Sequence, residues 1–210
     1  MPIKSDREYR RFMLTELETR EENNEKIVDG YATVFNEEYT LYSYAGYEVR
    51  ELFDPASFSE TDLSDVIMQY DHEGRVFARG SNGTLTVKPD AHGLRIRANL
   101  GGTQIGAQLF EEIKGGYTTK MSIGFTVKTQ ERTEERDEDA GRTIVHRKIT
   151  GVKKLYDVSA VSLPANDATE ISARNFGEGV IAEIEEERLA SLERQRRIKK
   201  IQILIEMGGT

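Results

Sequence analysis

The chain has 210 residues, a formal net charge of −8, three histidines and no cysteine. The missing cysteine excludes disulfides, thiol nucleophiles and zinc or iron–sulfur sites built on cysteine, and three histidines are too few for a His-rich metal site. The acidic balance argues against a general nucleic-acid binder, which carries excess Lys and Arg along one face. No apolar run approaches the roughly 20 residues of a membrane-spanning helix. We therefore expect a soluble cytoplasmic protein that uses no cofactor, metal, membrane or nucleic acid.

The first part of the chain predicts a strand that follows a charged segment. Residues 1–26 are dense in charge and are interpreted as a solvated arm or as an edge strand with a long turn. Residues 27–35, IVDGYATVF, are rich in β-branched and aromatic side chains and predict a strand. Asp54 can cap a helix and Pro55 is tolerated at its first position, so a helix is expected to begin there.

The central part of the chain is rich in strands and turns and contains one clear helix. Residues 103–114 place Ile105, Leu109 and Ile113 four positions apart, which predicts an amphipathic helix, and a Gly-Gly pair ends it. The polar stretch 129–141 is interpreted as a mobile hairpin loop. Expected strands cover residues 66–70, 76–79, 84–88, 94–99, 121–127, 142–150 and 152–163.

The last segment differs in composition from the rest. Residues 180–207 contain no proline and no glycine, and their apolar side chains recur at helical spacing, with acidic residues first and basic residues later. That order favours the helix dipole. We expect an amphipathic helix over 177–210 that serves assembly or oligomerisation, with folding back onto the body as the alternative. A β-barrel domain is expected over 27–176 and a charged arm over 1–26, so the fold class is mainly β with flanking helices.

Three polar residues are candidates for chemistry, and each also has a purely structural interpretation. His72 follows an apolar strand, where a sheet presents reactive groups, but a single histidine there is more often a surface or capping residue. Ser122 is followed two positions later by Gly124, which suits a nucleophile with close backbone approach, although a structural strand serine gives the same pattern. Asp157 stands in an otherwise apolar strand and must be solvated, paired or hydrogen-bonded. Orienting a histidine is one such use.

Six short motifs follow one another in a recognisable order. They are GYATVF at 30–35, ELFDPASF at 51–58, the strand end at His72, DAHGL at 90–94, SIGF at 122–125 and DVSAVSLPA at 157–165. In this order and spacing the chain resembles the prohead protease family of tailed phages, from about residue 27 to residue 166. One position departs from the family pattern, because the family often has glutamate where this chain has Asp157, a carboxylate shorter by one methylene group.

The resemblance implies a serine protease with a small β-barrel similar to that of assemblin, the herpesvirus capsid protease. It gives Ser122 the role of nucleophile, His72 the role of general base and Asp157 the role of third catalytic residue. His146 is a rival for the third place, because assemblins use a second histidine after the serine. Asp157 is preferred, since it lies inside a matched motif whereas His146 follows a charged loop.

The resemblance also implies a substrate and a location. The expected activity is cleavage of the scaffolding segment of a phage major capsid precursor, and of the protease itself, during prohead maturation. The expected location is the host bacterial cytoplasm, inside the assembling prohead, and the expected partners are the capsid precursor and further copies of the protease. The alternative is a non-catalytic capsid-assembly or scaffold module with the same barrel, which has no need of both His72 and Ser122.

Overall fold

A computed structural model describes residues 7–13, 18–23, 25–44, 46–161 and 167–208. The described residues are mainly β and contain eleven strands and two helices. The strands are β1 (Arg7–Met13), β2 (Glu18–Glu22), β3 (Glu25–Val34), β4 (Tyr39–Tyr44), β5 (Tyr47–Phe53), β6 (Ile67–Tyr70), β7 (Glu73–Arg79), β8 (Leu85–Pro89), β9 (Gly93–Asn99), β10 (Lys120–Asp137) and β11 (Arg142–Val161). The helices are α1 (Gln104–Lys114) and α2 (Asp167–Gly208).

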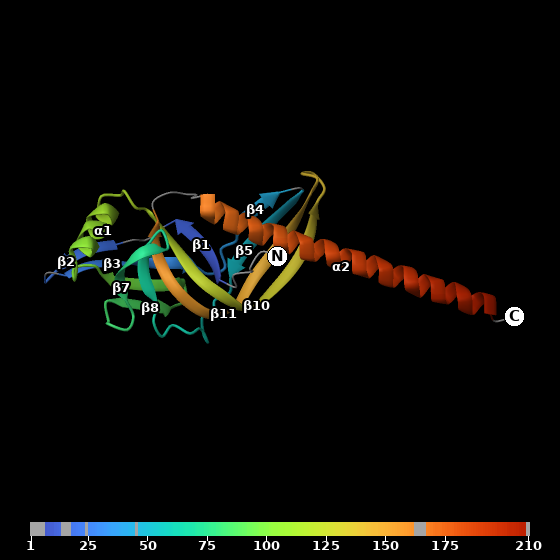
Figure 1. Ribbon diagram of the computed structural model, residues 1–210, viewed down its shortest axis with the longest axis horizontal. Helices are drawn as coiled ribbons and strands as arrows, with labels where there is room; N and C mark the ends of the chain where they lie inside the picture. Colours follow the sequence, from blue (N-terminus) through green and yellow to red (C-terminus); the bar gives the residue numbers. More distant parts are fainter. Residues whose placement is uncertain (1–6, 14–17, 24, 45, 162–166, 209–210) are drawn as a thin grey trace.

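The strands form two sheets that share one hydrophobic core. The seven-stranded sheet has the order β1-β10-β11-β5-β4, with β6 paired to β11 and β7 paired to β6, and the four-stranded sheet has the order β2-β3-β9-β8. The larger sheet curls into a half barrel (Figure 1). Val28 of β3, Ile96 of β9, Phe110 of α1, Phe125 of β10 and Leu155 of β11 are all fully buried in the common cluster. The expected class, mainly β with helices, is thus confirmed, and closure of a barrel stays a prediction.

The long hairpin of β10 and β11 organises the larger sheet. The two strands pair antiparallel from Lys120 opposite Val161 to Asp137 opposite Arg142, with register shifts near the middle. The polar stretch 129–141 was expected to be a loop, but residues 129–137 continue the strand, since they pair as the edge of a sheet with β11, which β5 flanks on its other side. The two strands expected over 142–150 and 152–163 are one strand, β11, which pairs in parallel with β5 and then with β6.

The two helical expectations within residues 27–176 have different outcomes. The helix expected at Asp54 is wrong: residues 55–60 form turns, in which Asp54 Oδ1 accepts a hydrogen bond from the backbone N–H of Ala56 at 2.8 Å. The capping chemistry is present, but no helix follows it. The helix expected over 103–114 is confirmed as α1, with the hydroxyl of Thr103 accepting from the backbone N–H of Gly106 at 3.0 Å.

The terminal helix α2 begins at Asp167, earlier than its apolar pattern indicates. Ile181 and Ile184 are buried, and Ile184 packs with Val49 and Val145. Beyond them the helix projects away from the sheets (Figure 1). Ile201 on the projecting part is 50% exposed. Within the described part of the chain, no helix is long and apolar enough to cross a membrane.

Candidate active site

Ser122 lies on the polar face of the strand β10. The side chains of a strand alternate between two faces, and here Met121, Ile123 and Phe125 enter the hydrophobic core. Ser122 and Gly124 therefore point to the opposite face. In the pairing with β11, Ser122 lies opposite Ser159 and Gly124 lies opposite Asp157. Antiparallel partners point to the same side of a sheet, so the four residues form one small polar patch.

His72 reaches this patch from a tight turn. Asp71 and His72 form the two-residue connection between β6 and β7, with φ angles of 49° and 61°. Two positive φ values are typical of the primed hairpin turns, which glycine and asparagine favour, so the protein holds His72 in a sparsely populated conformation. The backbone N–H of Asp71 donates to the carbonyl of Ala160 in β11 at 3.0 Å, which fixes the turn beside that strand.

The three side chains form a continuous chain of hydrogen bonds. His72 Nε2 lies 2.5 Å from Ser122 Oγ, and His72 Nδ1 lies 2.5 Å from Asp157 Oδ1. Ser122 and Asp157 are fully buried, and the side chain of His72 is 11% exposed. The structure thus brings together the three residues that the sequence analysis singled out.

The carboxylate of Asp157 is held by several donors. Ser159 Oγ donates to Asp157 Oδ1 at 2.8 Å, and the guanidinium of Arg7 donates to Oδ2. Burial, the largest single influence, raises the pKa of this carboxyl. The hydrogen bond from His72, the His72 charge, the Ser159 hydroxyl and the Arg7 charge together outweigh burial, so the pKa lies below its ordinary value. Asp157 is therefore ionised at neutral pH.

Gly124 leaves the space that this carboxylate occupies. A Cβ atom placed on Gly124 would lie 2.3 Å from Asp157 Oδ2 and 3.0 Å from Nε of Arg7. The first contact is closer than real Cβ atoms tolerate, and the second is tighter than most of them show. Only glycine at this position allows the carboxylate and the guanidinium to meet above β10.

Two residues of β1, Arg7 and Tyr9, also reach the site. The Tyr9 ring meets the ring of His72 edge-on, with centroids 4.4 Å apart. Neither residue was a candidate from the sequence, since residues 1–26 were interpreted as a solvated arm or as an edge strand with a long turn; β1 and β2 are edge strands. Arg7 precedes Asp157 by 150 positions, and no local pattern reveals that pairing.

The other two histidines lie away from the site. His146 Nδ1 is 2.6 Å from Glu38 Oε1. The two ring nitrogens of His72 are occupied by Asp157 and Ser122, so His146 is not the partner of His72. His92 occupies the turn between β8 and β9, where its ring packs against Tyr31 at 4.6 Å. Among the described residues, no group of three or more acidic or histidine side chains is arranged to hold a metal ion.

A cleft of about 630 Å³ lies beside the turn that carries His72. Its walls are the turn and first residues of β7 on one side and α1 on the other. Apolar side chains line part of it, and three acidic residues, an arginine and a glutamine line the rest. The lining residues are Tyr70, Asp71, Glu73, Gly74, Arg75, Phe77, Ile105, Gln108, Leu109 and Glu112.

Comparison with known protein families, like the geometry of the site, indicates a serine protease. The sequence model of the caudovirus prohead serine protease family matches residues 15–183. This chain belongs to that family. The match includes His72, Ser122 and Asp157 and leaves β1 outside. Phage prohead proteases of this family act inside the assembling capsid.

One solved structure that the chain matches is the bacteriophage T4 capsid assembly protease, gp21. It shares 12% sequence identity, and the alignment covers 74% of this chain and 98% of that chain with a TM-score of 0.42. Among curated proteins, no relative matches the chain.

Proposed function

We propose that this member of the prohead serine protease family is an endopeptidase in which Ser122 is the nucleophile and His72 the general base. Asp157 is the third catalytic residue. The observation that carries the proposal is the unbroken contact from Ser122 Oγ through both nitrogens of His72 to Asp157, with 2.5 Å at each step. A nucleophile, a base and a group that orients the base are the parts that acyl transfer needs.

The geometry defines the path of one proton. His72 Nε2 takes the hydroxyl proton as Ser122 Oγ attacks a peptide carbonyl carbon, and the resulting imidazolium returns that proton to the leaving amine nitrogen. Water then attacks the acyl ester, with Nε2 again as base. Throughout, Asp157 Oδ1 accepts the Nδ1–H bond of His72, which fixes the tautomer and stabilises the imidazolium. The lowered pKa of Asp157 keeps this carboxylate ionised for that purpose.

The proposed substrate is the scaffolding segment of a major capsid precursor, together with the protease itself. The cleft between β7 and α1 is the surface on which a substrate segment lies, because Asp71 and Glu73, the neighbours of the base in sequence, line it and apolar side chains there offer anchoring. Ser122 is fully buried, so a substrate carbonyl reaches its hydroxyl only after covering groups move. We therefore expect low activity in the free protein and higher activity in assembling proheads.

The test is co-expression of the chain with its capsid precursor, followed by the mass of the precursor. Wild type should shorten the precursor, while Ser122→Ala and His72→Ala should leave it intact. Ser191→Ala and His92→Ala are matched controls, since both residues are exposed and distant in sequence. If the precursor stays intact with wild type while shells still form, the non-catalytic assembly module is the better account.

A fluorophosphonate probe, which reacts with activated serines, tests the delayed activity separately. Ser122 should label slowly in the free protein and faster in isolated proheads. Equal labelling rates in the two samples would show that burial of Ser122 does not limit its reactivity.

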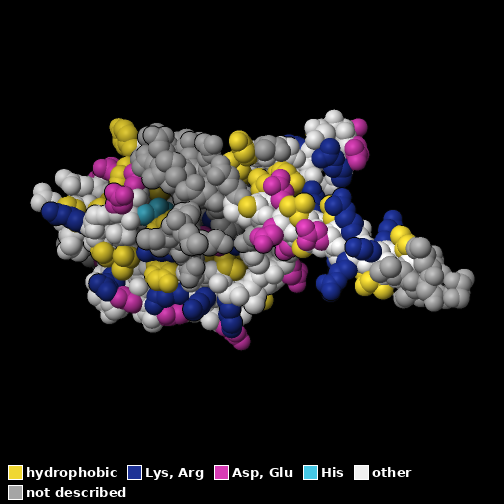
Figure 2. Space-filling view, turned by 45° about the vertical axis from the view of Figure 1, so that its right-hand side comes forward, with side chains coloured by type: hydrophobic (Ala, Val, Ile, Leu, Met, Phe, Trp, Pro, Cys, Tyr) yellow, Lys and Arg dark blue, Asp and Glu magenta, His cyan; other side chains and the backbone are white. Residues whose placement is uncertain are grey.

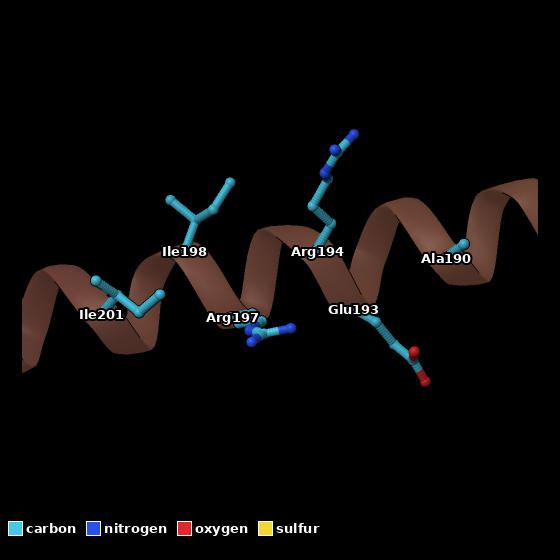
Figure 3. A pocket seen from close by; sticks show the side chains of 6 residues that line it. All are labelled: Ala190, Glu193, Arg194, Arg197, Ile198 and Ile201. Atoms are coloured by element: carbon cyan, nitrogen blue, oxygen red, sulfur yellow. The ribbon is translucent and has the colours of Figure 1, made fainter.

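The projecting part of α2 is proposed to bind α2 of a second copy in antiparallel orientation. Figure 2 shows acidic side chains where the helix meets the body and basic side chains along the projecting part. Antiparallel pairing places the acidic stretch 185–187 of one copy opposite the basic stretch 194–200 of the other. Figure 3 shows Ile198 and Arg194 on the same side of the helix. Ile198 is 50% exposed, so pairing would cover apolar surface.

The mass of the full chain in solution tests this pairing. The double variant Ile198→Glu/Ile201→Glu should be monomeric at concentrations where wild type is dimeric. Gln202→Ala keeps the charge pattern and the exposed isoleucines and should leave the dimer unchanged. A wild-type chain that is monomeric at high concentration would refute the proposal.

A further inference from the structure

The strand β1 presents two sets of side chains to two parts of the molecule. It pairs antiparallel with β10, so that Tyr9 lies opposite Gly124 and Arg7 opposite Thr126. Because opposite residues point to the same side, Arg7 and Tyr9 share the polar face that carries Ser122. The alternate residues, Glu8 and Arg10, point to the other side of the sheet.

The inward set anchors the strand through a buried ion cluster. Arg10 Nε donates to Glu51 Oε1 at 2.5 Å and its Nη2 to Oε2 at 3.0 Å. Arg147 also donates to Glu51, and it binds both carboxylate oxygens of Glu8 at 2.9 and 3.0 Å. The side chains of Arg10, Glu51 and Arg147 are 3%, 0% and 4% exposed. Two arginines balance two glutamates, so this cluster fixes β1 to β5 and β11 without a net buried charge.

The other set touches the candidate catalytic residues. The guanidinium of Arg7 donates to Asp157 Oδ2 and lies over the rings of Tyr9 and Tyr156, at 5.1 and 4.6 Å from their centroids. The ring of Tyr9 in turn meets His72. A planar guanidinium that contacts two aromatic rings has little freedom to turn. Its position therefore restricts the orientation of the carboxylate that it binds.

We propose that Arg7 is a positioning residue, which holds Asp157 so that Oδ1 faces His72, and that the ion cluster of Glu8, Arg10, Glu51 and Arg147 keeps β1 in place for this task. The inference rests on the proposed catalytic roles of His72 and Asp157. Its physical basis is that the two carboxylate oxygens of Asp157 have different donors: Oδ1 accepts from His72 and Ser159, while Oδ2 accepts from Arg7. Without the donor on Oδ2, the buried carboxylate can rotate toward other donors and carry His72 out of line with Ser122.

The test compares Arg7→Gln and Arg7→Lys in precursor cleavage by the full chain. Arg7→Gln should lower kcat by about 10- to 100-fold with KM changed less than about twofold, since Arg7 acts through Asp157 and not on the substrate. Arg7→Lys keeps the charge and should restore part of the rate, because an ammonium cannot stack between the rings as a guanidinium does. Arg20→Gln is the matched control: Arg20 also lies on an edge strand and pairs with an aspartate, Asp29, at 3.4 Å.

A second readout does not depend on turnover. The proton between His72 Nδ1 and Asp157 gives a far-downfield NMR signal when the bond is short and charge-assisted. This signal should move or broaden in Arg7→Gln and stay in Arg20→Gln. Tyr156→Leu, which removes one stacking ring and keeps the charge, should give a smaller change of the same kind.

The outcomes separate the two claims. If wild type cleaves, and Arg7→Gln matches Arg20→Gln in both kcat and the proton signal, the positioning role of Arg7 is wrong. A loss of rate in Arg7→Gln that comes with a large rise in KM, or that Arg7→Lys does not relieve at all, also overturns it. If wild type does not cleave but the proton signal moves in Arg7→Gln, the positioning holds and the proposed protease function fails.

Discussion

Gly124→Ala tests the geometry of the site at its tightest point. The added methyl carbon would lie 2.3 Å from Asp157 Oδ2 and 3.0 Å from two nitrogens of Arg7, Nε and Nη2. Carbon and oxygen atoms that are not bonded rarely approach closer than about 3.2 Å, so the carboxylate has to move by about 1 Å. Gly124 lies in a strand with ordinary backbone angles, so the change acts through this clash and not through the backbone.

The expected effect has two parts, a loss of catalytic rate and a loss of folding stability. A displacement of about 1 Å in a group that orients the base costs about 100-fold in rate, which corresponds to about 2.7 kcal/mol of transition-state stabilisation. Overpacking beside a buried residue costs about 1–3 kcal/mol of folding stability in addition. We therefore expect Gly124→Ala to fold, to melt at a lower temperature and to be about 100-fold less active.

The assay is the rate at which a fluorophosphonate labels Ser122 in assembled proheads, measured beside the melting temperature. Gly102→Ala is the control, because a Cβ at Gly102 meets nothing within 4 Å. If Gly124→Ala folds and labels at the wild-type rate, Asp157 does not orient His72 in the active state, and the assignment of the third residue is refuted.

Three further predictions concern the surroundings of the site. Ser159→Ala removes a donor to a charged acceptor, worth about 1.5–3 kcal/mol, and should lower kcat by at least about 10-fold, while Ser191→Ala, an exposed serine used as a control in the same assay, should not. The pKa of Glu51 is lowered to about 2: burial, the largest influence, raises it, but Arg10 and Arg147 lower it more. A lowered pKa stabilises the fold at pH values above the unfolded pKa of about 4.3, and this contribution is lost as the pH falls toward 2. Ionised Glu51 therefore supplies about 3 kcal/mol at neutral pH. In urea unfolding, the difference in free energy of unfolding between wild type and Glu51→Gln should shrink by that amount from pH 7 to pH 2, and a constant difference would contradict this. Gln108→Trp fills the cleft between β7 and α1 and should raise KM several-fold with Ser122 labelling unchanged; an unchanged KM would show that substrate binds elsewhere.

Local sequence patterns predicted most of the elements that carry the site. The strand that ends before His72, the helix capped by Thr103 and the strand around Ser122 follow from periodicity and turn residues, which act over a few positions. The helix expected at Asp54 is wrong because its signals are equally local. A capping residue and a proline suit the start of a helix, but the tertiary structure turns the chain instead. The polar stretch 129–141 shows the reverse case, in which pairing makes a strand from residues without strand periodicity.

The role of Arg7 could not be predicted, because it depends on which strands become neighbours. Arg7 lies in a run of charged residues that resembles a solvated arm, and its partner Asp157 is 150 positions away. The pairing of β1 with β10 brings them together, and a buried ion cluster secures that pairing. Charged residues in such a cluster look like surface residues in a sequence, since their burial becomes possible only when both signs meet in the fold.

Two of the six motifs that carry the family resemblance are one feature in three dimensions. In SIGF, the residues two positions apart are Ser122 and Gly124, and in DVS they are Asp157 and Ser159. Antiparallel pairing sets Ser122 opposite Ser159 and Gly124 opposite Asp157, so all four lie on one face of the sheet. The glycine makes room for the carboxylate, the second serine binds it, and the residues between them enter the core. A substitution in either motif therefore acts on the other. In both motifs the polar residues are two positions apart, because residues two apart in a strand point to the same face of the sheet.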